Sequence, residues 1–176
     1  MGDATRPPDR ISLEQHRDDP HLVERGARWV LLAALGALLV AALAGVFGQR
    51  HEDLSASGAE ARIELRAPAA LRSGLLFQGR FHVAAEEDLR KPTLVLDAGW
   101  FDAVSVNAIV PEPASSWSEG RRVAFAFPPL ERGQTMTVYA DFQMNPTTFG
   151  RRDEGVELRD GDHSIAVIRR TVNVFP

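Results

Sequence analysis

The segment Met136-Thr-Val-Tyr-Ala-Asp-Phe-Gln-Met144 alternates apolar and polar side chains along its length. Met136, Val138, Ala140, Phe142 and Met144 all fall on one side of this pattern. Side chains of a β-strand point alternately to the two faces of a sheet, so a period of two predicts a strand with one buried face. We therefore expect Phe142 and its apolar neighbours to point into a core between two sheets.

The same period of two recurs in short segments on both sides of this strand. They are residues 63–65, 77–83, 94–96, 104–109, 123–127, 156–158 and the final run 165–174. Turn-forming residues separate them, among them Gly74, Pro111, Gly133 and the pair Asp160-Gly161. Many short strands at this spacing predict an all-β fold, an immunoglobulin-like antiparallel β-sandwich of seven to eight strands over residues 61–176.

A resemblance supports this interpretation. In Pro128-Pro-Leu-Glu-Arg-Gly-Gln-Thr-Met-Thr-Val-Tyr-Ala-Asp-Phe142, a leucine–two residues–glycine turn leads into the alternating strand. This segment resembles the late hairpin of bacterial membrane-anchored immunoglobulin-like β-sandwich domains. The cysteines of antibody-type domains are absent. The resemblance implies a fold and no particular chemistry, because such sandwiches carry many functions.

Residues 29–47, from Trp29 to Phe47, contain no charged side chain. About 20 residues of helix cross a hydrocarbon core of about 30 Å, so this segment predicts one transmembrane helix. Two alternatives fit less well. A buried core helix is usually polar on one face. A cleaved signal peptide has a shorter apolar run and a shorter leader than the 28 residues before Trp29.

The segments on either side of this helix predict the domain order and the topology. Residues 1–28 are rich in charge and proline, which predicts a disordered tail. Residues 48–60, with serine and glycine, predict a flexible stalk. Arg17, Arg25 and Arg28 precede the helix closely. This excess of arginine on the N-terminal side of the helix favours a cytoplasmic N-terminus. The sandwich is then extracytoplasmic, and a single transmembrane pass holds it at the cell membrane.

Within the apolar segment, small residues recur every four positions. They are Ala33, Ala37, Ala41 and Gly45. Small side chains at this spacing let two helices approach closely in a membrane, which predicts a homodimer paired through this stripe. The alternative is that an alanine-rich span yields such a stripe by chance.

The composition argues against several classes of function. The chain has no cysteine, which excludes disulfides, thiolate metal ligands and cysteine nucleophiles. The net charge of −4 is well mixed, which argues against a nucleic-acid partner. The sequence contains no Gly-x-Ser-x-Gly element and no glycine-rich phosphate loop. We expect no enzyme, no cofactor and no metal. Abundant alanine and arginine, with Lys91 the only lysine, suggest a bacterial chain.

Aromatic and arginine side chains in the expected loops are the candidate contact residues, because tryptophan and arginine are enriched at binding hot spots. The alternative for the rings is that they fold back to cap the core. The candidates are Trp100, Phe101, Trp117, Phe149, Arg151 and Arg152.

Together these features favour a non-enzymatic, membrane-anchored interaction module that contacts another membrane or envelope protein. The alternative is a module that binds cell-wall glycan, or another ligand, through its loop aromatics. That alternative requires Trp100 and Trp117 to line one concave surface.

Overall fold

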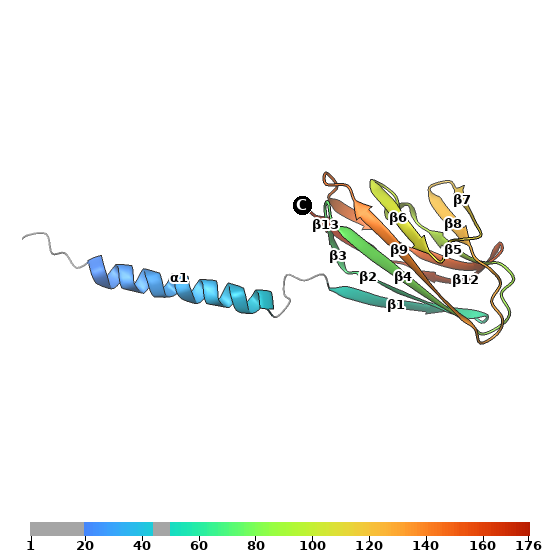
Figure 1. The fold of residues 1–176 in the computed structure, drawn as a ribbon, viewed down its shortest axis with the longest axis horizontal. Coiled ribbons are helices and arrows are strands. Elements are labelled where there is room, and N and C mark those ends of the chain that lie inside the picture. The colour runs from blue at the N-terminus through green and yellow to red at the C-terminus, as the bar shows by residue number, and fades with distance from the viewer. Residues whose placement is uncertain (1–19, 44–49) are drawn as a thin grey trace, which may run out of the picture. The chain divides into compact units, whose positions relative to one another are not determined.

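The computed structural model describes residues 20–43 and 50–176. The chain divides into two compact units, with the boundary between Gly48 and Gln49. The first unit contains helix α1 (Pro20–Leu43), and the second is the β-domain. Figure 1 shows the strands of the β-domain arranged in overlapping layers.

Helix α1 contains residues 29–43 of the predicted apolar segment. Its portion Gly26–Leu43 has the length and mean hydropathy of a membrane-spanning helix, properties that a signal sequence near the N-terminus shares. The helix begins at Pro20, so the prediction of a disordered tail is wrong for residues 20–28. Proline is favoured in the first turn of a helix, where its missing N–H would have no partner.

Parts of three predictions lie outside the described residues. They are the tail over residues 1–19, the end of the apolar segment at 44–47, and Gly45 of the small-residue stripe. Ala33, Ala37 and Ala41 lie on α1, and their role in helix pairing stays a prediction.

Two five-stranded antiparallel sheets form the β-domain, and a small third sheet lies at one end. The first sheet has the order β1 (His51–Ser57), β2 (Ala61–Pro68), β4 (Leu76–Ala85), β9 (Thr135–Met144) and β6 (Val104–Val110). The second has the order β12 (His163–Ile168), β11 (Val156–Asp160), β5 (Pro92–Leu96), β8 (Arg122–Ala126) and β7 (Ser115–Glu119). The third has the order β10 (Gly150–Asp153), β13 (Thr171–Phe175) and β3 (Ala70–Arg72), in which β13 and β3 are parallel.

The prediction of an all-β sandwich is confirmed. Strand β2 alternates buried and exposed residues, and Phe142 of β9 is completely buried, as the period of two predicted. Phe81, Leu94 and Leu158 contribute to the same core from both large sheets. The 50–176 portion contains thirteen strands rather than seven or eight, because short segments such as β3 and β10 pair without an apolar period of their own.

The prediction of a flexible stalk over residues 48–60 is wrong for residues 51–57, which form β1, and residues 48–49 lie outside the described residues. All seven residues of β1 pair in register with β2, from His51 opposite Pro68 to Ser57 opposite Arg62. Leu54 and Ala56 are half-buried and pack against the core. The serine and glycine content of this segment suggested flexibility. The alternation of Leu54 and Ala56 with polar residues nevertheless gives β1 one buried face, and pairing with β2 provides hydrogen-bond partners for its backbone.

The connections gather at the two ends of the sandwich. One end carries the start of β1, the β2–β3 connection, the short helix η2 (Ala98–Trp100), the β7–β8 turn and the β12–β13 turn. The close approach of β10 to η2 at this end requires glycine, because a Cβ atom on Gly99 would collide with the carbonyl group of Asp153. This end also holds the candidate site.

Candidate interaction groove

Arginine doublets occur three times in the sequence, and all three lie at this end of the sandwich. Arg122 begins β8, Arg151 and Arg152 lie within β10, and Arg169 and Arg170 connect β12 to β13. One arginine of each pair is exposed, and the other is half-buried or buried. The doublets are Arg121-Arg122, Arg151-Arg152 and Arg169-Arg170.

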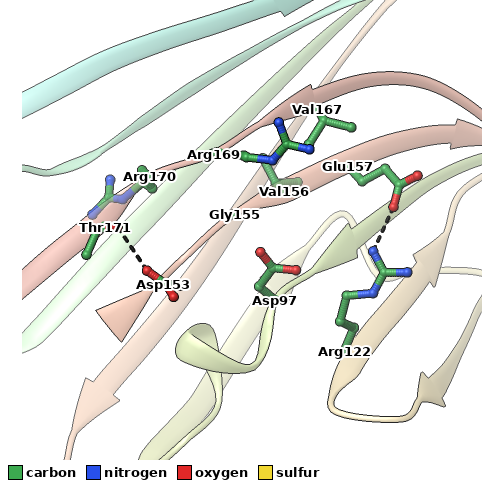
Figure 2. Close-up of a pocket in the computed structure, with 10 residues that line it drawn as sticks. All are labelled: Asp97, Arg122, Asp153, Gly155, Val156, Glu157, Val167, Arg169, Arg170 and Thr171. Atoms are coloured by element: carbon green, nitrogen blue, oxygen red, sulfur yellow. Dashed lines mark hydrogen bonds and ion pairs between the residues drawn. The ribbon is translucent and has the colours of Figure 1, made fainter. Parts of the chain in front are cut away.

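The doublets line two adjoining hollows that share Asp97, Arg122 and Asp153, and we call the two together the arginine groove. Their volumes are about 610 and 600 Å³. The first hollow, which Figure 2 shows, is also lined by Gly155, Val156, Glu157, Val167, Arg169, Arg170 and Thr171. The second is also lined by Ala98, Gly99, Asp102, Arg121, Thr148, Phe149, Arg151 and Arg152.

The inward arginines hold the groove together. Arg122 Nη1 lies 2.8 Å from Glu157 Oε2, across from β8 to β11 (Figure 2). Arg152 donates hydrogen bonds to the backbone carbonyls of Gly99 and Asp102, which ties β10 to the η2 segment. Because these guanidinium groups already bind Glu157 and backbone carbonyls, they fix the shape of the groove. The exposed arginine of each doublet is the one that is available to contact another molecule.

The exposed arginines are available to a partner. Arg121 forms an ion pair of 2.8 Å with Asp102, and both side chains are exposed, so this pair adds little stability. Among the described residues, Arg151 and Arg169 form no ion pair within 4.0 Å. Phe149 lies beside them with 74% of its surface exposed. The groove therefore offers guanidinium groups and one large ring to solvent.

Beneath the groove lies a buried ion pair. Arg170 Nη2 is 3.0 Å from Glu154 Oε2, and the two side chains are 3% and 0% exposed. Arg170 also donates to the carbonyl of Pro68 and lies over the Trp100 ring. Among the described residues, neither Glu154 oxygen accepts an aligned hydrogen bond, and Nε and Nη1 of Arg170 donate none. Burial raises the pKa of Glu154 to about 7, against the opposing charges of Arg170 and Arg152.

A second charged cluster borders the groove on the outer face of the second large sheet. Arg159 bridges Glu157 and Glu119 at 2.8 and 3.0 Å, and Arg122 bridges the same two carboxylates. Hydrogen bonds from Arg159, Ser164 and Arg122 lower the pKa of Glu157 to about 2. This cycle of four charges links β7 and β8 to β11 across the intervening strand β5, at the edge of the groove.

The low pKa of Glu157 predicts an acid-sensitive contribution to stability. The carboxyl is ionised in the folded domain down to about pH 2, whereas the ordinary pKa of a glutamate carboxyl is 4.5. Its contribution is therefore present above pH 4.5 and lost as the pH falls toward 2. We expect Glu157→Gln to cost about 1–2 kcal/mol near neutral pH and much less near the lower limit. Denaturant unfolding at several pH values measures this loss of stability, with Glu64→Gln, at an exposed site, as the control. If Glu157→Gln cost the same free energy of unfolding at neutral pH and near pH 2, the prediction would be contradicted.

The structure corrects the proposed role of Trp100. Its side chain is completely buried, and its ring packs with Phe77, Phe81 and Phe142. Trp100 Nε1 donates to the carbonyl of Gly155 at 3.1 Å. The polar turn around it suggested a loop, but η2 turns the ring inward. Trp100 is therefore a core residue and no contact residue.

Trp117 was expected in a polar loop, and that expectation is wrong, because it lies in β7. Its half-buried ring donates a hydrogen bond of 3.0 Å to Glu119 and lies 4.9 Å from the Lys91 ammonium. Phe101 is half-buried and packs against the core. Neither tryptophan lines the arginine groove, so the concave aromatic surface that the glycan alternative requires is not formed by Trp100 and Trp117.

Three of the predicted contact residues do meet in one place. Phe149, Arg151 and Arg152 line the second hollow, although Arg151 and Arg152 lie in strand β10 rather than in a loop. The sequence interpretation missed their neighbours Asp97, Arg121, Arg122, Asp153, Arg169 and Arg170. The repeated arginine doublet at strand ends is the signal that could have identified most of them.

Comparison with known proteins adds little beyond the fold. No family model matches the chain, and no curated protein matches it. Among solved structures, it is similar to a non-cellulosomal cohesin from the hyperthermophilic archaeon Archaeoglobus fulgidus. The identity is 16%, the TM-score is 0.37, and the alignment covers 62% of this chain and 88% of that chain. The fold and groove define the chain as a β-sandwich protein with an apolar N-terminal helix and an arginine-lined groove.

Proposed function

We propose that this protein is a non-enzymatic interaction module, anchored in the cell membrane by α1, that binds an acidic segment of another membrane or envelope protein in the arginine groove. One observation carries the proposal: all three arginine doublets converge on this groove. Six arginines line it, against the four carboxylates of Asp97, Asp102, Asp153 and Glu157.

The arrangement suits carboxylate recognition. A guanidinium group binds a carboxylate through two parallel hydrogen bonds, which gives both energy and direction. Arg151 and Arg169 have no ion pair among the described residues, so a partner's carboxylates would meet them without first displacing another acid. Phe149 adds an exposed ring of the kind enriched in protein contact sites.

The glycan alternative receives no comparable support. Stacking on sugars needs exposed rings along one surface, and Trp100 is buried while Trp117 covers the outer face of β7. Phe149 alone is exposed beside the groove.

The test is crosslinking in the membrane. A photoreactive amino acid at Phe149 in the full chain should capture one recurrent protein. We expect Arg151→Glu with Arg169→Glu to abolish that product, because the new carboxylates repel an acidic segment. Both sites are exposed, so stability should change by less than about 0.5 kcal/mol each. The matched control is Arg90→Glu, an exposed arginine outside the groove. Undiminished capture by the groove variant would overturn the proposal.

A further inference from the structure

Exposed apolar side chains gather at the end of the sandwich where the first strand begins. Leu75, Leu76, Phe149 and Phe175 are 45%, 61%, 74% and 53% exposed. They are half of the exposed large apolar residues of the β-domain, the others being Val106, Val110, Tyr139 and Val167. We call these four the apolar rim.

Hydrogen bonds hold the rim beside the start of β1. Ala69 N donates to the carbonyl of Arg50 at 2.8 Å, next to His51. From there β3 leads to Ser73, whose N–H donates to the carbonyl of Phe175 at 2.8 Å. Figure 1 shows β3, β13 and the beginning of β1 at this same end of the domain.

Hydrogen bonds and strand pairing fix the backbone of the rim, so its apolar side chains are not exposed by local disorder of the chain. The carbonyl of Leu75 accepts a hydrogen bond from Met144 N at 3.1 Å, and Leu76 pairs with Gln143 in the first large sheet. Gly74 takes a positive φ of 75° to make the turn before them. Phe149 precedes Gly150, which pairs with Val174 of β13.

The chain length restricts what can lie next to this rim. The apolar segment of the sequence ends at Phe47, and β1 begins at His51. Four residues span at most about 14 Å when fully extended. If α1 is anchored in a bilayer, the start of β1 therefore lies within about 14 Å of the place where the apolar segment ends. The rim lies beside that start.

The charges of this end suit a phospholipid surface. Exposed Arg72 pairs with Phe175 in the register of β3 and β13, and exposed Arg151 lies opposite Asn173. Arginine beside apolar side chains is the combination that enters the headgroup region, because the guanidinium groups contact phosphates while the apolar groups reach the acyl boundary.

We propose that Leu75, Leu76 and Phe175 of the apolar rim insert into the headgroup region of the phospholipid bilayer that holds α1, so that the sandwich is docked on its own membrane, while Phe149 and Arg151 stay at the border with the arginine groove. The inference rests on the proposed function only in requiring that α1 is anchored. It deepens that function, because a docked sandwich presents the arginine groove to segments of partner proteins that lie next to the bilayer.

The absence of cysteine makes the test direct, because single cysteines can carry an environment-sensitive fluorophore. The full chain is reconstituted in vesicles of phosphatidylcholine with phosphatidylglycerol and labelled at Leu76→Cys or Phe175→Cys. We expect blue-shifted emission at both sites, quenched by lipid-borne nitroxide and not by aqueous iodide. A label at Asp162→Cys, in the β11–β12 hairpin at the other end, should be quenched by iodide.

Three further variants separate the possible outcomes. A label at Leu39→Cys reports whether α1 is inserted in the bilayer. If lipid-borne nitroxide quenches the label at Leu39 while iodide quenches the labels at Leu76 and Phe175, docking is overturned and the proposed membrane-anchored interaction module is not. Iodide quenching at Leu39 as well would overturn both proposals. Protection of the rim from both quenchers would show a protein covering it, and would also overturn docking. Leu75→Glu with Leu76→Glu should return the Phe175 label to water, whereas Val110→Glu should not.

Discussion

Replacing Trp100 by alanine should lower the free energy of unfolding of the β-domain by about 3–5 kcal/mol, the range for removing a large buried ring. The side chain is completely buried and contacts three phenylalanine rings, with ring centroids 5.2 to 6.4 Å apart. It also donates the hydrogen bond that holds the carbonyl of Gly155. Domains of this size are stable by about 5–15 kcal/mol, so the loss takes a large part of the total.

Denaturant titration of the purified full chain, followed by far-UV circular dichroism, measures this change. Trp117→Ala is the matched control, because that ring is half-buried on the outer face of β7 and should cost about 1–2 kcal/mol. The gap between the two variants tests the assignment of Trp100 to the core. Equal losses, or a larger loss for Trp117→Ala, would contradict it.

The period of two explains why the architecture could be predicted from the sequence. In β2, β4 and β9 each strand has one face toward the core, so burial alternates as the apolar residues do. β1 escaped prediction because Leu54 and Ala56 are its apolar pair between polar residues, and their burial depends on pairing with β2. β10 was taken for a loop because it pairs with β13, a segment about twenty residues further along the chain, and such pairing carries no local signal.

The candidate site was predicted in part for the same physical reason. Phe149 and Arg151, which line the groove, could be selected from the sequence as candidate contact residues because an aromatic ring next to arginines is a local feature. Trp100 was misplaced because its neighbours in sequence are turn residues, whereas its burial depends on Phe77 and Phe142 from other strands. The convergence of the arginine doublets depends on sheet order, which the sequence pattern does not specify.

The buried pair under the groove leads to the second large effect, which depends on pH. Burial raises the pKa of Glu154 to about 7, from an ordinary value of 4.5. The folded domain therefore holds a proton that the unfolded chain releases between these values, so stability is full below pH 4.5 and falls as the pH rises through 7. A shift of this size corresponds to about 3 kcal/mol. Glu154→Gln should make the free energy of unfolding much less dependent on pH, because the side chain no longer titrates.

Arg170→Met should then lower the free energy of unfolding by about 3–5 kcal/mol near pH 8, because the buried Glu154 carboxyl must there either stay ionised without its partner or hold a proton against the pH. Near pH 5 the carboxyl is protonated with or without Arg170, since Arg170 lowers its pKa to about 7 from a still higher value, and the loss should be much smaller. Adding Glu154→Gln to Arg170→Met should recover most of the loss at the higher pH, because the unpaired charge is gone. Denaturant unfolding of the two single variants and the double variant at both pH values gives the coupling directly. Two outcomes would contradict this prediction: a loss for Arg170→Met that is the same at both pH values, or a loss that adding Glu154→Gln does not relieve. Either would show that Arg170 stabilises the domain through its hydrogen bond to Pro68 and its contact with Trp100, and not through Glu154.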